Sequence, residues 1–334
     1  MSPNNTIYLD NNATTKTDPR VLESMLPYFT ELYANTNSSH LDGLYVREAV
    51  ENATWQVADL ISAKQHEIIF TSGATESINL AIKGLKSISR KRIITFTTEH
   101  KAVLDTCLYM ENQGYHVDYL SVKTDGTINI DNFKNTITED TAMVIVMLSN
   151  NETGTIQDIE RISEITRANG AILLCDTTQC IGKIPVNINE LGVDMLTISA
   201  HKFYGPKGIG ALYVSNKSKI KLDAQIHGGG QQRNMRSGTL NVPGIIGLGK
   251  ACEIAKSEMK NDESRISLLR DQLEIELLKI EGSFVNGSVK HRIYNTSNIC
   301  FPGVWSEQLI MSLEIFRFQT ALPAPLSPQN RRTS

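Results

Sequence analysis

The sequence predicts an α/β fold with a mostly parallel sheet flanked by helices. Short apolar runs alternate with stretches of helical periodicity, and glycine lies at or near the end of several helical stretches. Buried parallel strands have continuous apolar sequences, and the helices between them cover both faces of the sheet. At 334 residues, the chain is long enough for one large domain and a smaller one.

The elements of the predicted sheet follow one another along the first two hundred residues. Strands are expected at residues 67–71, 92–96, 143–148, 171–175 and 195–199. Helices are expected at residues 75–83, 102–113 and 159–168. Ligands of such sheets bind at the carboxyl ends of the strands, so the segments after residues 70, 175 and 199 point to one shared site.

The pattern changes from about residue 244, where two long helical stretches, 249–260 and 264–280, are expected. We predict a large domain at residues 13–260 and part of a smaller α+β domain at residues 1–12 plus 261–314. The N-terminal residues are assigned to the smaller domain because Tyr8-Leu9-Asp10 has the pattern of a short strand that needs a sheet to join. Residues 315–334 form a tail outside both domains.

Composition and charge narrow the class of protein. A net charge of −3 gives no electrostatic reason to expect nucleic acid or an anionic membrane as a partner. The N-terminus has no basic stretch followed by an apolar one, so no signal peptide is expected. The apolar runs are far shorter than a membrane span. We therefore expect a cytoplasmic protein.

The five cysteines are expected to be free thiols, buried or half-buried. They are Cys107, Cys175, Cys180, Cys252 and Cys300. They form no CxxC pair and have no zinc-ligand spacing, so no metal site is expected.

Two segments predict a site for pyridoxal phosphate (PLP). This cofactor requires a lysine that holds its aldehyde covalently and an acid that keeps its ring nitrogen protonated. Lys202, in Ser-Ala-His-Lys-Phe-Tyr-Gly-Pro-Lys-Gly, and Asp176, in Asp-Thr-Thr-Gln, are the candidates. Gln179 lies three residues after Asp176 and is placed to reach the ring hydroxyl. A helix N-cap is the alternative role for Asp176.

The loop Thr-Ser-Gly-Ala-Thr-Glu at residues 71–76 joins a predicted strand to a predicted helix. Its glycine and the free N–H groups at the start of the helix suit the cofactor phosphate. A plain capped turn is the alternative.

Three further polar positions follow strands or lie in a glycine-rich loop. His100 is a candidate for stacking on the cofactor ring and for proton transfer, with a purely structural role as the alternative. Asn151 is a candidate contact to the substrate or the ring hydroxyl. The basic, glycine-rich loop at residues 227–239 suggests a phosphate or subunit contact, or else a flexible surface loop.

The chain resembles the cysteine desulfurases of the iron–sulfur-cluster and nitrogen-fixation branch, which are PLP enzymes of the class V aminotransferase superfamily. The matching segments, in order, are YLDNNATT at 8–15, FTSGATESINLAIKG at 70–84, TEHKAVLDTC at 98–107, NNETG at 150–154, DTTQ at 176–179, SAHKFYGPKGIGALY at 199–213 and HGGGQQRNMRSGT at 227–239. The resemblance implies the PLP-dependent transferase fold type I, here with an incomplete smaller domain.

The resemblance also implies a role for each candidate residue. Lys202 would bind the cofactor and move protons at the substrate carbons, and His100 would stack on the ring. The other implied contacts are Asp176 to the ring nitrogen, Gln179 to the ring hydroxyl, Ala74, Thr75, Ser199 and His201 to the phosphate, Asn151 to the substrate and ring, and Thr239 to the phosphate of a partner subunit.

The implied reaction removes sulfur from L-cysteine, leaving L-alanine and a persulfide on an enzyme cysteine. The sulfur would pass to an iron–sulfur scaffold or another acceptor protein, and the enzyme would be a homodimer. Two alternatives stay open: a non-catalytic PLP-binding or dimer-partner protein, and another class V aminotransferase-type enzyme. The TEHKAVLDTC and RSGT segments favour the desulfurase branch.

The resemblance stops after Glu314. The family continues there with a loop of the form Ser-x-Gly-Ser-Ala-Cys-Ser, whose cysteine accepts the sulfur, and later with an arginine that binds the substrate carboxylate. Residues 315–334 contain neither group in that context. Our hypothesis is a frameshift after Glu314 that truncates the family sequence. The chain as given would then bind PLP but lack desulfurase turnover.

This hypothesis predicts the gene sequence of the tail. Codons allowed for residues 315–326 can be chosen so that the shifted frame encodes Ile-Ser-Val-Ser-Asn-Gly-Ser-Ala-Cys-Ser-Ser. We expect sequencing across the codons for residues 313–334 to show codons with this property. Codons that cannot encode the cysteine loop in the other frame would contradict the frameshift.

Overall fold

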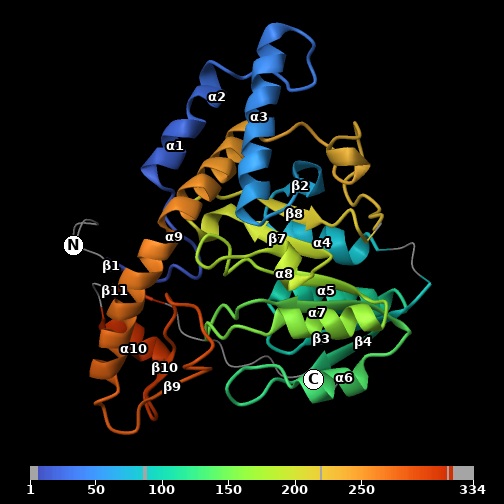
Figure 1. Cartoon of the computed structure of the whole chain (residues 1–334). Helices are drawn as coiled ribbons and strands as arrows, with labels where there is room; N and C mark the ends of the chain where they lie inside the picture. The colour runs from blue at the N-terminus through green and yellow to red at the C-terminus, as the bar shows by residue number, and fades with distance from the viewer. Residues whose placement is uncertain (1–6, 86–88, 219, 314–315, 319–334) are drawn as a thin grey trace.

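A seven-stranded sheet forms the centre of the computed structural model, which describes residues 7–85, 89–218, 220–313 and 316–318 (Figure 1). Its strands lie in the order β2-β8-β7-β6-β5-β3-β4. Their bounds are β2 Ile68–Thr71, β3 Arg92–Phe96, β4 His116–Leu120, β5 Thr141–Met147, β6 Ile172–Asp176, β7 Met195–Ser199 and β8 Gly210–Val214. Only β8 pairs antiparallel, with β7 and β2, so the prediction of a mostly parallel sheet is confirmed.

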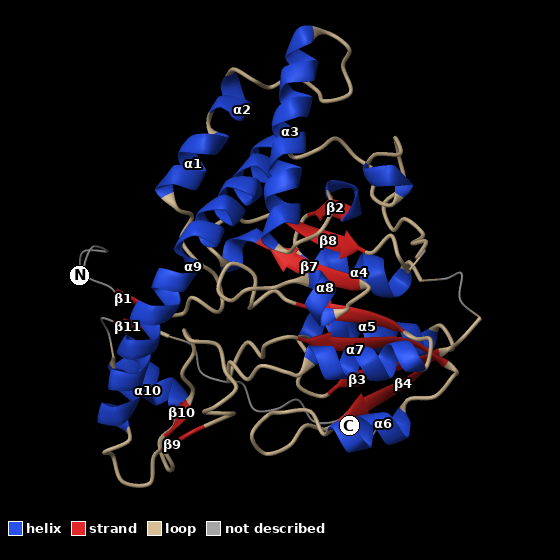
Figure 2. Cartoon of the chain, in the orientation of Figure 1, coloured by secondary structure: helices blue, strands red, loops and turns tan. Residues whose placement is uncertain are grey.

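Helices cover both faces of this sheet, as Figure 2 shows by secondary structure. The helices around the sheet are α4 Ala74–Lys83, α5 Lys101–Asn112, α6 Ile130–Thr136, α7 Ile159–Ala168 and α8 Ile188–Leu191. Alternate side chains of a strand point to opposite faces. In β6, Leu173 and Cys175 therefore join the apolar cluster that includes α7, while Leu174 joins the cluster that includes α4 and α5.

The predicted bounds of several elements agree closely with the structure. The strand expected at 195–199 is β7 and the helix expected at 159–168 is α7. The start of α7 is fixed by the Asp158 carboxylate, which accepts a hydrogen bond from the N–H of Arg161. Such a cap satisfies one of the free N–H groups of the first turn.

The prediction of two separate helices after residue 244 is wrong. The structure has one helix of 36 residues, α9 Val242–Leu277. The helices at the N-terminal end of the chain are α1 Pro19–Met25, α2 Pro27–Thr30 and α3 Leu41–Leu60. The polar residues 261–263 suggested a break, but none of them is glycine or proline, and nothing in the backbone there opposes a continuous helix. The predicted domain boundary near residue 261 falls inside α9.

The C-terminal half of α9 lies beside a group of small elements (Figure 1). They are β9 Phe284–Val285, β10 Ile299–Cys300, α10 Ser306–Ser312, β1 Ile7–Tyr8 and β11 Phe316–Arg317. The strand expected at Tyr8 is present as β1, and it pairs in parallel with β11. Residues 316–318 of the predicted tail therefore lie beside the N-terminal strand, and residues 319–334 are outside the described residues.

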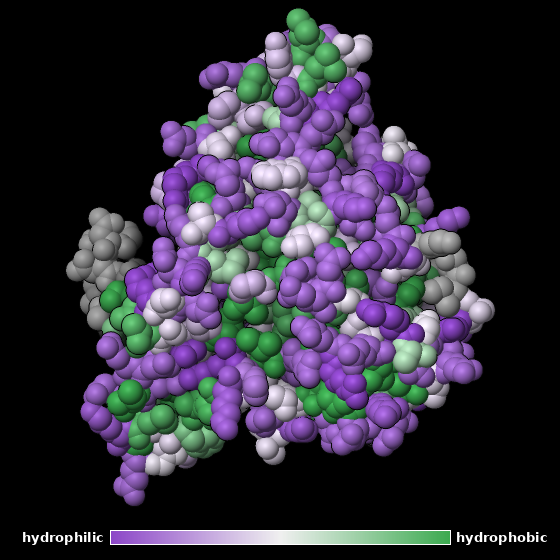
Figure 3. All heavy atoms as spheres, in the orientation of Figure 1, coloured by the Kyte–Doolittle hydropathy of each residue, from purple (hydrophilic) through white to green (hydrophobic). Residues whose placement is uncertain are grey.

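Apolar side chains are exposed at several places on the surface. Figure 3 shows hydrophobic atoms at the tip near the α2–α3 connection and over the group of α10, β9 and β10. The exposed residues near the tip are Leu26, Phe29, Tyr33, Leu41 and Tyr45. Among the described residues, no helix combines the length and the apolar character that a bilayer crossing requires.

The contact between α3 and α9 predicts the effect of one substitution. A Cβ atom at Gly249 would lie 2.7 Å from the Ala53 Cα atom. Alanine favours a helix interior over glycine by about 1 kcal/mol, but overpacking a tight contact costs about 1–3 kcal/mol. We expect Gly249→Ala to lower the free energy of unfolding by about 1 kcal/mol in urea titrations. The exposed Ser264→Ala in the same helix should change it by less than about 0.5 kcal/mol. A stabilised Gly249→Ala protein would contradict the close approach.

Candidate functional site

The candidate site lies at the carboxyl ends of the central strands. Asp176 is the last residue of β6 and Ser199 the last residue of β7, and a short 3₁₀ turn, Ala200–Lys202, follows directly. Parallel pairing of β6 with β7 puts both ends at one edge of the sheet. Ligands bind at this edge in α/β sheets.

Lys202 meets the N-terminal segment at this edge. Its Nζ donates hydrogen bonds to the carbonyl oxygens of Asn12, at 2.5 Å, and Ala13, at 2.9 Å. Burial lowers the pKa of Lys202, and the charges of Asp176 and Asp10 partly oppose this. A lowered pKa increases the neutral fraction of the amine, which is the form that attacks an aldehyde.

Asp176 is buried and held through one of its carboxylate oxygens. Oδ1 accepts hydrogen bonds from Thr197 Oγ1 at 2.8 Å, Thr178 Oγ1 at 2.5 Å and the Thr178 N–H at 3.0 Å. These bonds fix the carboxylate and leave Oδ2 for a further donor. The alternative role as a helix N-cap is wrong, because residues 177–184 form turns and no helix.

Gln179 connects the turn after β6 to the same backbone oxygen that Lys202 contacts. Its Nε2 donates to the Asn12 carbonyl at 2.9 Å. The Asn12 side chain in turn donates to the Asn151 carbonyl oxygen at 3.2 Å. The structure thus brings Lys202, Gln179 and Asn151 together around Asn12.

The loop before α4 forms a compact turn beside Ser199. Gly73 has φ +153°, which L side chains rarely adopt, and a Cβ built on Gly210 would lie 2.7 Å from the Gly73 Cα atom. Ala74 and Thr75 are the first two residues of α4. N–H groups of a first helical turn lack intrahelical partners and favour anions.

Glu76 fixes this loop on its outer side. Its carboxylate accepts from the Ser72 N–H at 2.8 Å and from Arg236 Nε at 2.9 Å. Burial raises the pKa of Glu76, but the hydrogen bonds from Arg236 and Ser72 outweigh it and hold the pKa below its usual value. The capped-turn alternative for this loop agrees with the structure, because Glu76 closes the turn, and the phosphate role stays a prediction. The ion pair ties the glycine-rich loop to α4, while Thr239 at the end of that loop is exposed.

The two histidines are held in different ways. His100 caps α5, with Nδ1 accepting from the Ala102 N–H at 3.0 Å, so a neutral ring carries its hydrogen on Nε2. This cap is the structural role that the sequence left open, and the exposed ring remains at the end of β3. His201 Nδ1 lies 3.0 Å from Thr14 Oγ1. Burial, with the charges of Lys202 and Lys207, lowers the pKa of His201 to about 4, so the ring is neutral at neutral pH.

Sequence reasoning missed a second buried acid at this site. Glu99 is 5% exposed, and its Oε1 accepts from the Met147 N–H at 2.8 Å. Its Oε2 is buried with no hydrogen-bond partner among the described residues. Burial raises the pKa of Glu99 well above its usual value, and the nearby Asp176 charge adds to this rise. Burial thus favours the protonated form of Glu99 beside Asp176.

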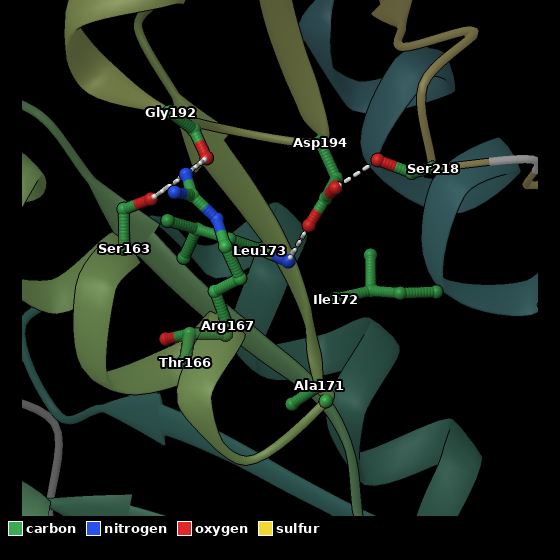
Figure 4. Close-up of a pocket in the computed structure, with 10 residues that line it drawn as sticks. Ser163, Thr166, Arg167, Ala171, Ile172, Leu173, Gly192, Asp194 and Ser218 are labelled. Carbon is green, nitrogen blue, oxygen red and sulfur yellow. Dashed lines mark hydrogen bonds between the residues drawn. The ribbon is translucent and has the colours of Figure 1, made fainter.

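A polar hollow at the opposite edge of the sheet is a separate feature (Figure 4). It lies beside the amino ends of β6 and β7, where Arg167 donates to Ser163 and to the Gly192 carbonyl. Asp194 accepts from the Leu173 N–H and from Ser218. The hydrogen bonds among these groups connect α7 to this edge of the sheet. None of them involves Lys202 or its neighbours at the other edge.

Comparisons with known proteins agree with this fold. The class-V aminotransferase family profile matches residues 7–315. A cysteine desulfurase IscS of Actinobacillus succinogenes is 51% identical over 313 residues, which span 92% of this chain and 78% of that protein. The counterpart of Methylobacillus flagellatus is 48% identical over 319 residues, or 94% and 79%.

Solved structures give the same result. A NifS-like protein superimposes with a TM-score of 0.89 at 38% identity, covering 92% of this chain and 85% of that one. The protein SspA in complex with cysteine superimposes with a TM-score of 0.82 at 34% identity, covering 98% and 91%. The fold is thus that of the PLP-dependent fold type I enzymes.

The chain belongs to the class-V aminotransferases. Within them it belongs to the cysteine desulfurases, an enzyme family whose cofactor is PLP. The residues at the sheet edge fit this cofactor. Lys202 offers an amine of lowered pKa, Asp176 a fixed carboxylate with Oδ2 available, and the start of α4 offers free N–H groups.

Glu99 predicts a pH dependence of stability. A carboxyl group with a raised folded-state pKa stabilises the fold fully below its unfolded-state pKa, and this contribution is lost as the pH rises through the folded-state pKa. Glutamine does not titrate. We therefore expect Glu99→Gln to gain stability relative to the wild type as the pH rises above 4.5, the ordinary pKa of the carboxyl group, in urea titrations. A stability difference that does not change with pH would show that folding does not raise the pKa of Glu99.

Proposed function

We propose that this chain is a PLP-dependent cysteine desulfurase by descent, with a complete cofactor site and no sulfur-accepting step of its own. The main support for this proposal is that Lys202 and Gln179 both donate hydrogen bonds to the Asn12 carbonyl oxygen. This contact lies at the sheet edge where hydrogen bonds hold Asp176. The reaction of the lineage converts L-cysteine to L-alanine and passes the sulfur on as a persulfide. The cysteine in the solved SspA complex supports L-cysteine as the substrate class.

The proposed roles follow from the placement of each side chain. Lys202 binds the cofactor aldehyde and moves protons at the substrate carbons. Its lowered pKa increases the fraction of neutral amine, which is the form that attacks the aldehyde and accepts a proton. Asp176 pairs with the ring nitrogen through Oδ2, and Gln179 faces the ring hydroxyl. PLP supplies an electron sink that stabilises negative charge on the substrate carbon. His100 covers the ring with its capped imidazole.

The phosphate is proposed to bind at the start of α4. Ala74 and Thr75 offer backbone N–H groups there, and Ser199 lies beside the loop, with its hydroxyl 3.7 Å from a Cβ position built on Gly73. His201 adds a neutral ring hydrogen bond rather than a charge, because its pKa is about 4. Asn151 contacts the substrate from the loop after β5.

The sulfur step requires an accessible thiolate. The substrate C–S bond breaks and an S–S bond forms to the enzyme sulfur, while the substrate carbon gains a proton and becomes the methyl group of alanine. An attacking thiol must be exposed and ionised. The cysteines of this chain are free thiols, as expected.

Four of the five cysteines of this chain do not meet that requirement. Cys107, Cys175, Cys180 and Cys252 are buried, and burial raises the pKa of each thiol, to about 12 for Cys180. Cys300 is half-buried and lies in the β9–β10 pair, opposite Phe284. These placements support the proposal that the chain lacks the sulfur-accepting cysteine. They also favour the second candidate function, a PLP-binding or dimer-partner protein without turnover.

The remaining proposals concern partners and compartment. Exposed apolar residues near α2, such as Phe29 and Tyr33, suit burial against a second copy of the chain. Thr239 in that copy would reach the phosphate of the first. The protein acts in the cytoplasm, and the lineage delivers sulfur to an iron–sulfur scaffold or another acceptor protein. The domain division at residue 260 remains part of the proposal.

The proposal predicts the result of a direct assay. The purified chain should show the visible absorbance of PLP linked to Lys202, and Lys202→Ala should lose that band, because the variant lacks the amine that forms the covalent link; PLP held without this link absorbs at a different wavelength. With L-cysteine added, we expect spectral changes from substrate binding but no sulfide or alanine above the Lys202→Ala level. The relative from Actinobacillus succinogenes provides the active control. Turnover at the rate of that control would disprove the missing sulfur step, and lack of a PLP band would disprove the cofactor site.

A further inference from the structure

Lys183 is a buried lysine close to the candidate site. None of the roles proposed above for the cofactor and the substrate involves this residue. Lys183 lies in the turn after β6 and is only 6% exposed. Burial lowers the pKa of Lys183 to about 8, while Cys180 opposes and Lys202 adds to this fall. Burying an ammonium group is costly unless its hydrogen bonds are satisfied. Its place in the fold therefore requires a specific partner.

That partner is the Gln179 amide. Lys183 Nζ donates to Gln179 Oε1 at 3.1 Å. A lysine ammonium has three donors and no acceptor, so only the oxygen of the amide can face it. The Gln179 NH₂ group must then point the other way, where Nε2 donates to the Asn12 carbonyl at 2.9 Å. Lys183 and the Asn12 carbonyl therefore fix the same orientation of the amide from opposite ends.

The Asn12 carbonyl shows which side the NH₂ group faces. The same oxygen accepts from Lys202 Nζ at 2.5 Å, so the Gln179 NH₂ group lies on the Lys202 side of the turn. We propose that Lys183 is a positioning residue that holds the Gln179 amide with its NH₂ group toward the ring hydroxyl of the cofactor. This inference rests on the proposed PLP site.

The orientation has a chemical consequence. An NH₂ donor stabilises an ionised ring oxygen, whereas a flipped amide would present its own oxygen and favour the protonated form. Removing the donor raises the pH at which the bound cofactor loses the proton that it shares with the ring oxygen. Removing a nearby cation has the same sign, so the two effects must be separated by a double-mutant cycle.

The test measures the visible absorbance of the holoenzyme against pH for the wild type, Lys183→Met, Gln179→Leu and the double variant. We expect Lys183→Met to raise the titration midpoint by about one pH unit, the equivalent of one hydrogen bond. In the Gln179→Leu background, Lys183→Met should add little, because its effect passes through the amide. Equal shifts in both backgrounds would show a plain charge effect and overturn the inference.

A second variant covers the case in which Lys183→Met does not fold. Lys183→Arg keeps the charge and the donors, so its midpoint should stay within about a third of a pH unit of the wild type. A shift as large as that of Gln179→Leu would overturn the inference. A wild type with no visible band would instead disprove the proposed PLP site. The two failures are therefore distinguishable.

Discussion

The buried carboxylate of Asp176 is the constraint to which the rest of the site conforms. A charge at the end of a buried strand is costly without donors, and Thr178 and Thr197 supply them within the turn and the neighbouring strand. The same charge favours the neutral form of Glu99 and partly restores the basicity of Lys202. Two acids and one half-buried lysine thus share the sheet edge, and the protonation of Glu99 and of Lys202 depends on the charge of Asp176.

The N-terminal segment completes the site from outside the sheet. Its backbone carbonyls at Asn12 and Ala13 accept from Lys202, and the Asn12 oxygen also accepts from Gln179. The N–H of Thr15 donates to the His201 carbonyl, so the segment is held along the whole turn after β7. Residues nearly two hundred positions apart therefore set the geometry of the lysine. This is why the site needs the N-terminal strand region as well as the sheet.

Much of the sheet could be predicted from the sequence, because its strands have a local signal. Apolar runs such as residues 195–199 define strands, and the candidate residue Lys202 lies in the turn directly after that strand. The single helix α9 was missed because exposed polar residues 261–263 look like a break in the pattern. Glu99 and Lys183 were missed because a charged side chain in a polar segment gives no sign of burial. Their roles depend on contacts between distant strands and turns.

The charge balance of the site determines how it can hold a phosphate. His201 is neutral at neutral pH, with a pKa of about 4, and Arg236 already pairs with Glu76. Neither supplies a free positive charge to the start of α4. In the proposed site, the phosphate would then depend on N–H groups, hydroxyls and the helix dipole at the start of α4, all of which favour anions. The Thr239 hydroxyl of a second subunit, which the proposal places here, would add a further uncharged donor to this set.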